Sequence, residues 1–170
     1  MASRARPSFR SVSRLIDANL NRALEGLRVC EDIVRFHEEH PTEAGYPAKL
    51  GGRRKCQGAR AHRARLARRL RALRHAVAVA AARLPGGHLE LLRARDSRRD
   101  VGRRAPTTAE SSLERLLLIN FQRAKESLRV LEECARVVAP RCSGTFQAIR
   151  FRAYDLERDT LLTLAALRHP

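Results

Sequence analysis

The sequence is poor in aromatic side chains, with no tryptophan, two tyrosines and five phenylalanines among 170 residues. Aromatic and β-branched residues favour strands, whereas the alanine, leucine and arginine that dominate here favour helices. Nowhere does an apolar run approach the roughly 20 residues that a membrane-spanning helix needs. These absences argue against a membrane protein and predict an all-α fold, and the length suffices for one domain with a buried core.

Acidic residues are missing between Glu43 and Glu90, a stretch that holds twelve of the 35 lysines and arginines. This stretch accounts for most of the formal net charge of +17. A basic helical module that binds nucleic acid is one alternative that such charge raises. The concentration of charge beside one segment and the scarcity of aromatics argue against it, because the rest of the chain has an ordinary balance.

The four cysteines form no C-x-x-C pair and have no histidine at metal-ligand spacing. At an offset of 101 residues Cys30 aligns with Leu131 and Cys134 with Ile33, which predicts that these two cysteines are buried structural thiols. A reducing, cytoplasmic compartment is the simplest one. Several common motifs are also missing: the P-loop pattern, G-x-G-x-x-G, G-x-S-x-G and H-E-x-x-H. The sequence therefore carries none of the usual signatures of nucleotide-binding folds, serine hydrolases or zinc proteases.

One stretch occurs twice, at a constant offset of 101 residues. The first copy spans residues 16–35 and the second 119–136. Nine residues are identical between the copies; in the first they are Asn19, Arg22, Ala23, Glu25, Leu27, Arg28, Val29, Glu31 and Arg35. A second match, of residues 70–74 with residues 146–150, has an offset of 76. The duplicated unit is therefore a helical hairpin.

Proline, glycine and apolar periodicity predict the helices and the breaks between them. We expect a disordered leader over 1–12 and a first helix from Ser13 to Pro41. A flexible basic insertion would fill 41–62. A second helix would follow over 63–83, then an irregular connector over 91–108. The third would start near Thr107 or Ser111 and stop at Pro140, and the fourth would cover 144–168.

Residues 13–170 would then form a single helical domain from two repeats, 13–83 and 111–168. Two hairpins of one design would pack as a four-helix bundle with a pseudo-twofold axis. In the first copy Asn19, Arg22, Glu25 and Arg28 step by three residues and form a polar band on the helix. Asn120, Arg123, Glu126 and Arg129 repeat it. The bundle could bring both bands to one cleft.

Such bands have an ordinary interpretation, because glutamate and arginine at helical spacing form solvated ion pairs. The same ordered set in both copies favours a function instead. Guanidinium groups bind phosphate with two hydrogen bonds, and carboxylates between them can hold Mg²⁺ or orient an arginine. The residues alone therefore indicate a helical phosphate site.

Five motifs carry a resemblance to a known family. They are R-L-I-D-A-N-L-N-R-A-L-E-G-L-R-V-C-E-D-I-V-R-F, L-R-A-L-R-H, A-R-D-S-x-x-D-V-G, N-F-Q-R-A-K-E-S-L-R-V-L-E-E and F-x-A-I-R-F-x-x-Y-D-L-E. Together they resemble the small helical hydroxymethylpyrimidine phosphate kinases of thiamine biosynthesis, which stand alone or are fused to thiamine-phosphate synthase. The resemblance implies an enzyme that transfers a phosphoryl group from ATP, with Mg²⁺, to 4-amino-5-hydroxymethyl-2-methylpyrimidine monophosphate. The insertion is foreign to this pattern.

The resemblance also implies roles for the residues. Arg22, Arg28, Arg123 and Arg129 would neutralise phosphates; Glu25, Asp32, Glu126 and Glu133 would hold Mg²⁺ or orient these arginines. Asn19 and Asn120 would bind the aminopyrimidine edge or a phosphate. In the connector Arg95, Asp96, Asp100 and Gly102 would contact ligand, and Arg74 and Arg150 would line the cleft. A non-catalytic partner of thiamine-phosphate synthase is a further alternative, and a homo-oligomer stays open.

Overall fold

The computed structural model describes residues 9–36, 52–104, 109–110 and 112–168, and within them it contains helices and no strand. The helices are α1 (Phe9–Phe36), α2 (Gly52–Ala82), α3 (Gly87–Ala94), a short 3-10 helix (Val101–Arg104), α4 (Leu113–Val138) and α5 (Pro140–Arg168). The predicted all-α class is therefore confirmed.

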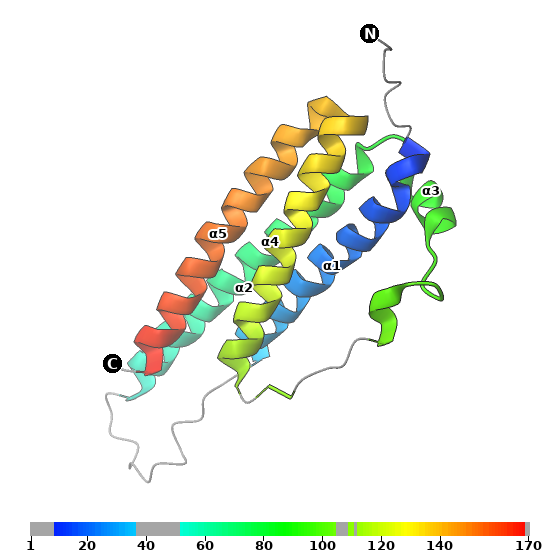
Figure 1. The fold of residues 1–170 in the computed structure, drawn as a ribbon. Coiled ribbons are helices and arrows are strands. Elements are labelled where there is room, and N and C mark those ends of the chain that lie inside the picture. Colours follow the sequence, from blue (N-terminus) through cyan, green and yellow to red (C-terminus); the bar gives the residue numbers. More distant parts are fainter. Residues whose placement is uncertain (1–8, 37–51, 105–108, 111, 169–170) are drawn as a thin grey trace.

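Four long helices form the predicted bundle (Figure 1). α1 packs against α2 and α4, and α5 packs against α4 and α2, so the four helices surround one core. Each helix is antiparallel to both of its neighbours (Figure 1). In the part that the structure describes, no helix combines the length and the hydrophobicity that crossing a membrane requires.

The core is formed by apolar residues that recur at helical spacing on the long helices. On α1 the buried residues include Ala23, Leu27, Cys30 and Val34. Phe121 and Phe146 are the largest side chains that are fully buried, and they come from the second hairpin. Burial raises the pKa of the Cys30 thiol to about 12. This thiol is thus a neutral core group, as the repeat predicts.

α1 and α4 come into close contact at Gly26. A Cβ atom added there would lie 2.8 Å from the carbonyl oxygen of Asn120, so only glycine fits without a shift. One turn further along α1, the Cys30 Sγ lies 3.8 Å from the carbonyl oxygen of Leu117. These two contacts fix which levels of the antiparallel helices face each other, and we call this contact the α1–α4 seam.

Both helices of the first hairpin begin earlier in the sequence than expected. α1 begins at Phe9 and not near Ser13, and α2 begins at Gly52 and not at Arg63. Residues 9–12 of the expected leader and 52–62 of the expected insertion are thus helical. The rest of both segments, 1–8 and 41–51, lies outside the described residues. α5 likewise begins four residues early, since Pro140 needs no backbone donor in a first helical turn.

The described part of the connector after α2, up to residue 104, is more ordered than expected. It contains α3, whose Leu91 is buried, and it runs along α1 toward the start of α4 (Figure 1). Gly86 precedes α3 with a φ of 82°, a conformation that glycine adopts readily, and its Cα faces the ring of Phe9. α4 is capped by Ser112, whose Oγ accepts a hydrogen bond of 3.1 Å from the Arg115 backbone.

Candidate functional site

In the first hairpin a buried carboxylate gathers three arginines. Glu31 of α1 is 1% exposed; its Oε1 accepts a 3.0 Å hydrogen bond from Arg71 and its Oε2 one of 3.1 Å from Arg74. Arg28 lies 3.8 Å away. Desolvation raises the pKa of Glu31, but the hydrogen bonds from Arg71 and Arg74 outweigh it and hold the pKa below its usual range. The carboxylate therefore fixes these guanidinium groups in place.

The second hairpin repeats this arrangement around Glu132. Its Oε2 accepts a hydrogen bond of 2.9 Å from Nε of Arg150 and forms an ion pair of 2.9 Å with Nη2, and its Oε1 accepts a hydrogen bond of 3.1 Å from Arg129. Glu132 corresponds to Glu31 at the offset of 101, and Arg150 corresponds to Arg74 at the offset of 76. The pseudo-twofold symmetry thus extends from the backbone to one buried ion pair in each half.

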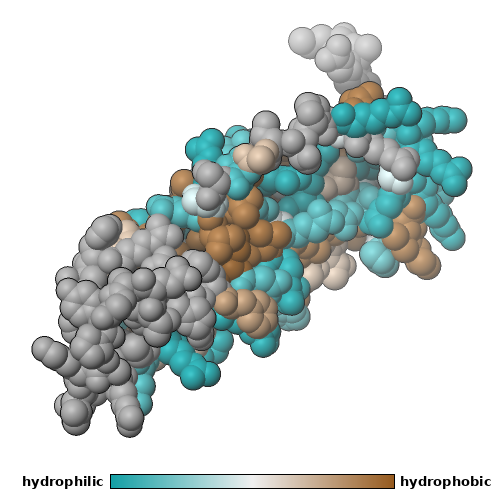
Figure 2. Space-filling model, turned by 90° about the horizontal axis from the view of Figure 1, so that it is seen from below, coloured by the Kyte–Doolittle hydropathy of each residue, from teal (hydrophilic) through white to brown (hydrophobic). Residues whose placement is uncertain are grey.

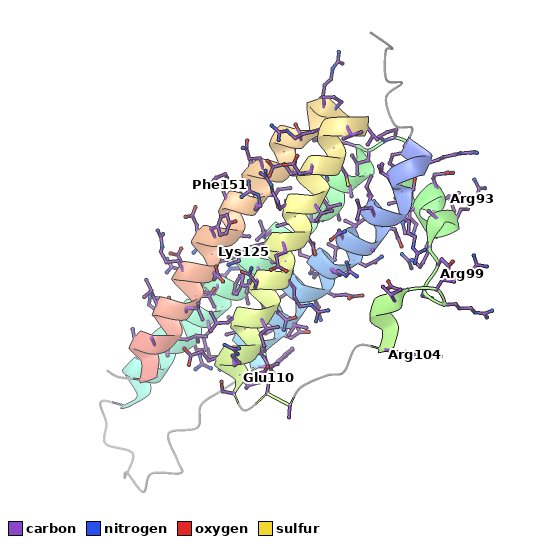
Figure 3. The ribbon with its side chains drawn as sticks, in the orientation of Figure 1. Arg93, Arg99, Arg104, Glu110, Lys125 and Phe151 are labelled. Atoms are coloured by element: carbon purple, nitrogen blue, oxygen red, sulfur yellow. The ribbon has the colours of Figure 1, made fainter. Side chains whose placement is uncertain are left out.

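The two clusters are not identical. Gln147 stands where the first half has Arg71, so the second half has one guanidinium fewer. In exchange it has Lys125, whose ammonium group lies 2.6 Å from a carboxylate oxygen of Glu157. Tyr154 is nearby, with its ring centroid 5.3 Å from the Lys125 nitrogen. Lys125 on α4 lies beside α5, which carries Phe151 (Figure 3).

Five of the eight band residues have a partner within their own helix, and two of these five form ion pairs. Arg28 pairs with Asp32 at 2.9 Å, and Arg129 pairs equivalently with Glu133 at 2.6 Å. Glu126 accepts a hydrogen bond from Gln122. The asparagines Asn19 and Asn120 are buried, and each side-chain amide donates to a carbonyl four residues earlier.

Arg22, Glu25 and Arg123 are the exceptions, since none of the three has a hydrogen bond or ion pair to another described residue. Both arginines are exposed. Measured from the α1–α4 seam at 1.5 Å per residue, they lie within about 3 Å of the same level of the bundle. Among the described residues they are thus a pair of cations without an ion-pair partner, at one level of the bundle.

The two buried clusters lie far apart along the bundle. Glu31 and Glu132 lie about 25 Å apart along the bundle, because α1 and α4 run in opposite directions from the seam. The two bands themselves run antiparallel and cover nearly the same levels of the bundle, because Asn19 lies level with residues 127–128 of α4 and Arg28 with residues 118–119. A single cleft lined by both bands stays a prediction.

The connector contributes a further polar region beside α1. Arg95 donates two hydrogen bonds, of 2.8 and 2.6 Å, to the buried carboxylate of Asp17. This pairing with Asp17 raises the pKa of the arginine, and Glu25 adds to the effect. Arg14 donates to the backbone carbonyl of Asp96. The motif residues thus anchor the connector to the polar face of α1.

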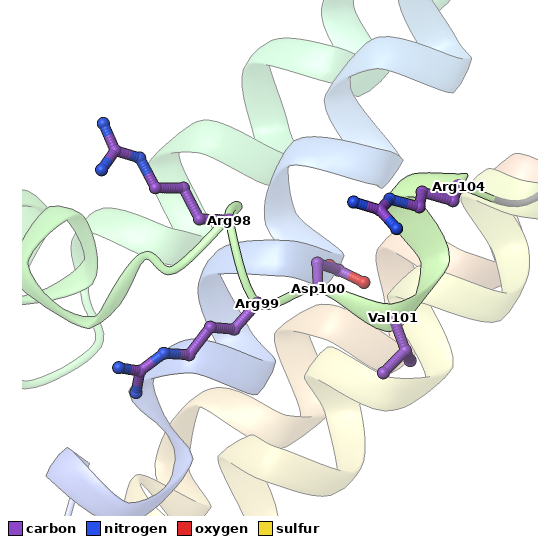
Figure 4. A pocket seen from close by; sticks show the side chains of 5 residues that line it. All are labelled: Arg98, Arg99, Asp100, Val101 and Arg104. Atoms are coloured by element: carbon purple, nitrogen blue, oxygen red, sulfur yellow. The ribbon is translucent and has the colours of Figure 1, made fainter.

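A shallow pocket lies on this connector, lined by Arg98, Arg99, Asp100, Val101 and Arg104. Arg98 and Arg99 extend from the loop on one side, and Arg104 comes from the 3-10 helix on the other (Figure 4). The Asp100 carboxylate accepts a hydrogen bond of 2.8 Å from the Gly102 backbone, which shapes the turn. Sequence reasoning singled out Asp100 and Gly102 and did not single out the three arginines.

The acidic residues suit arginine pairing better than metal binding. Among the described residues no three acidic, histidine or cysteine side chains gather closely enough to hold a metal ion. Asp32 and Glu133, both expected to hold Mg²⁺ or to orient arginines, each pair with an arginine. The donor set of these residues does not fit a magnesium site formed by the protein alone.

Three buried carboxylates were not among the site residues predicted from the sequence: Asp17, Glu31 and Glu132. The repeat did contain a signal for two of them, since Glu31 and Glu132 are identical at the 101-residue offset. Asp17 has no such signal because Leu118 takes its place in the second copy.

Comparison with known proteins places these observations in a family context. The sequence model of the ThiD2 family matches residues 14–49 and 59–159. The internal stretch that it leaves out, 50–58, falls within the expected insertion. No solved structure matches the chain.

Curated relatives are thiamine-phosphate synthases. The enzyme of Thermosynechococcus vestitus is 36% identical over 155 residues, which cover 91% of this chain and 36% of the relative. That of Synechococcus sp. (strain CC9605) is 35% identical over 161 residues, covering 92% and 38%. The Synechocystis sp. enzyme is 32% identical over 154 residues, covering 89% and 36%. The chain thus spans little more than a third of the length of these relatives.

Proposed function

Because the chain belongs to the ThiD2 family, we propose that it serves thiamine biosynthesis as an ATP-dependent kinase. Its substrate would be 4-amino-5-hydroxymethyl-2-methylpyrimidine monophosphate and its product the diphosphate. The observation that carries the proposal is the pair of arginines without a partner among the described residues, Arg22 and Arg123, at the α1–α4 seam between two clusters of carboxylate-oriented arginines. Phosphoryl transfer needs mainly such positioning and charge neutralisation.

The proposed step is a displacement at phosphorus. An ionised oxygen of the pyrimidine monophosphate attacks the γ-phosphorus of ATP and forms a new P–O bond. The bond from that phosphorus to the bridging oxygen breaks, and ADP leaves with the electron pair. The attacking oxygen is already largely ionised at neutral pH, so no strong general base is required.

In this proposal the residues act by electrostatics. Arg22 and Arg123 neutralise charge on the two phosphate groups where they meet, and fixed guanidinium groups stabilise charge better than mobile water does. Glu31 and Glu132 keep the neighbouring arginines oriented. Magnesium would enter as the counter-ion of ATP, and no step is assigned to a metal held by the protein.

The test is an assay of ADP and pyrimidine diphosphate formation from Mg·ATP and the monophosphate. We expect product from the native protein. We expect Arg123→Ala to reduce kcat/KM about 100-fold, the usual effect of removing one group that stabilises transition-state charge. The far-ultraviolet circular dichroism should stay unchanged, since Arg123 is exposed and makes no described contact.

Arg152→Ala is the matched control, because Arg152 is an exposed arginine on α5 that has no described partner and no role in the proposed site. It should leave kcat/KM within about twofold. Equal turnover by native and Arg123→Ala proteins would remove Arg123 from the site. No product from the folded native protein would overturn the kinase proposal.

A second candidate function is association with thiamine-phosphate synthase. It is favoured by the relatives, because in them the matching segment makes up only 36% and 38% of a longer chain named thiamine-phosphate synthase. Co-purification of the chain with a synthase, without turnover of ATP, would support this role in place of the kinase.

A further inference from the structure

We infer that the two halves of the bundle bind different substrates: the face of α4 and α5 around Tyr154 takes the pyrimidine ring, and the face of α1 and α2 around Glu31 takes the polyphosphate of ATP. This inference rests on the proposed kinase function. It follows from the side chains in which the two pseudo-symmetric halves differ, since shared residues cannot distinguish the substrates.

The first difference is an exposed aromatic pair. Phe151 and Tyr154 of α5 are 55% and 41% exposed, and their ring centroids lie 5.9 Å apart in an edge-to-face arrangement. The Arg150 guanidinium lies 4.9 Å from one ring centroid and 5.7 Å from the other. Exposed rings held in place by a buried cation offer a stacking surface to a flat heteroaromatic ligand.

The equivalent positions of the first half have no such surface. His75 and Ala78 stand at the positions of Phe151 and Tyr154. The α1 and α2 face therefore has a single imidazole where the other half has two aromatic rings. A ring-binding role belongs to the second half on this ground.

The second difference is a hydrogen-bonding pair. Lys125 and Glu157 are 12% and 17% exposed in their side chains and lie beside the Tyr154 ring. An aminopyrimidine presents an amino donor next to a ring nitrogen acceptor, which a carboxylate and an ammonium group complement. Leu24 and Ala81 occupy the equivalent positions of the first half and cannot form these hydrogen bonds.

The third difference is charge. Arg71 adds a third guanidinium to the Glu31 cluster, and the neutral Gln147 replaces it in the second half. The side chains of Arg28 and Arg71 are 47% and 60% exposed, so they can also reach an external anion. A triphosphate chain carries more negative charge than a monophosphate, and the cluster richer in guanidinium groups suits it better.

The level of the ring-binding face agrees with the proposed reaction. Lys125 lies two residues from Arg123 on α4, about 3 Å along the bundle. A pyrimidine held beside Lys125 and Tyr154 is thus close to the level of the α1–α4 seam, where we place the phosphate groups.

Calorimetric titration with two separate probes tests this assignment. The first is the pyrimidine monophosphate without ATP, and the second is inorganic tripolyphosphate without pyrimidine. The double variant Phe151→Ala/Tyr154→Ala should weaken binding of the pyrimidine at least tenfold, the scale of lost base stacking, and leave tripolyphosphate binding unchanged. Arg71→Ala should weaken tripolyphosphate binding at least fivefold and spare the pyrimidine.

Phe36→Ala is the matched control, because Phe36 is also an exposed phenylalanine, 64% exposed, with an arginine guanidinium 4.7 Å from its ring centroid. It should alter neither titration. The assignment is overturned if the double variant binds pyrimidine normally, if both variants weaken both probes equally, or if the native protein binds neither probe. Because no ATP is hydrolysed in these titrations, binding with the expected pattern but without turnover would overturn the kinase and keep the division of the halves.

Discussion

At the scale of single residues, the most consequential groups are the buried carboxylates that hold arginines. Glu132 is 4% and Arg150 10% exposed in their side chains, so each neutralises a charge that water does not reach. Removing one member of such a pair costs more than removing both, because the remaining charge is left buried without a partner.

We therefore predict that Glu132→Leu alone lowers the free energy of unfolding by about 3–5 kcal/mol. The double variant Glu132→Leu/Arg150→Leu should be more stable than this single variant, since leucines fill the space without an unpaired charge. Urea denaturation of the native protein, both single variants and the double variant completes the cycle. Simple additivity of the two single losses would contradict the account.

These pairs also mark where sequence reasoning on residues ends. The repeat identifies Glu31 and Glu132 as shared, and the helical period places them near the apolar stripe. It does not reveal that arginines of α2 and α5 meet them, because the partners are about 40 and 18 residues away and depend on how the hairpins close. The half-buried neighbours Asp32 and Glu133 therefore looked equally suitable.

At the scale of elements, the α1–α4 seam depends on a missing side chain. Gly26 is in the middle of a helix, where glycine costs about 1 kcal/mol relative to alanine. Glycine at this position allows the Asn120 carbonyl oxygen of α4 to come close to α1, since a Cβ would lie only 2.8 Å from that oxygen.

Gly26→Ala should lower the free energy of unfolding by about 1–3 kcal/mol, because the backbone of α4 must move away and the overpacking outweighs the gain in helix propensity. Gly144→Ala is the matched control on α5, where a Cβ would meet no atom within 4 Å. It should raise stability by up to about 1 kcal/mol. Thermal and urea denaturation measure both; a stabilised Gly26→Ala would show that the seam has room.

The long helices were predictable because each has an apolar stripe repeating over many turns and a clear stop. The first and last residues of the helices were harder to predict. α3 has only eight residues, too short for a periodic signal, and it is placed by Leu91 packing under it. The arginine-rich start of α2 shows no apolar periodicity, so its helical residues 52–62 looked like a loop.

At the scale of the whole molecule, α2 is held on two sides by ion pairs. Glu31 joins it to α1 through Arg71 and Arg74, and Asp159 of α5 lies 2.8 Å from Arg69. Hydrogen bonds from Arg69 and Arg158 hold the pKa of Asp159 below its usual value of 3.8. Both acids therefore bind protons less readily in the folded protein than in the unfolded chain.

The lowered pKa of Glu31 makes the stability of the fold depend on pH. A folded pKa below the unfolded value contributes stability that is present above the unfolded pKa and lost as the pH falls through the folded one. For Glu31 the loss begins below its usual value of 4.5. We predict that the stability difference between the native protein and Glu31→Gln is largest above pH 5 and shrinks as the pH is lowered beneath 4.5.

Urea denaturation at several pH values between 7 and 3 measures this difference. Asp155→Asn is the control, since Asp155 is an exposed carboxylate on α5 with no described partner. Its difference from the native protein should stay near zero throughout. A constant gap for Glu31→Gln across this range would mean that the carboxylate does not couple to protons as proposed.

The two ion pairs at the centre of the clusters also differ in the length of chain that they enclose. Glu132 and Arg150 are 18 residues apart, whereas Glu31 and Arg74 are 43 apart. Closing the shorter loop costs less chain entropy, by about 0.6 kcal/mol for each doubling of length. Contacts that are closer in sequence also form faster. The second hairpin thus has the kinetic advantage during folding, and the first hairpin can then pack against a pair of helices that has already formed.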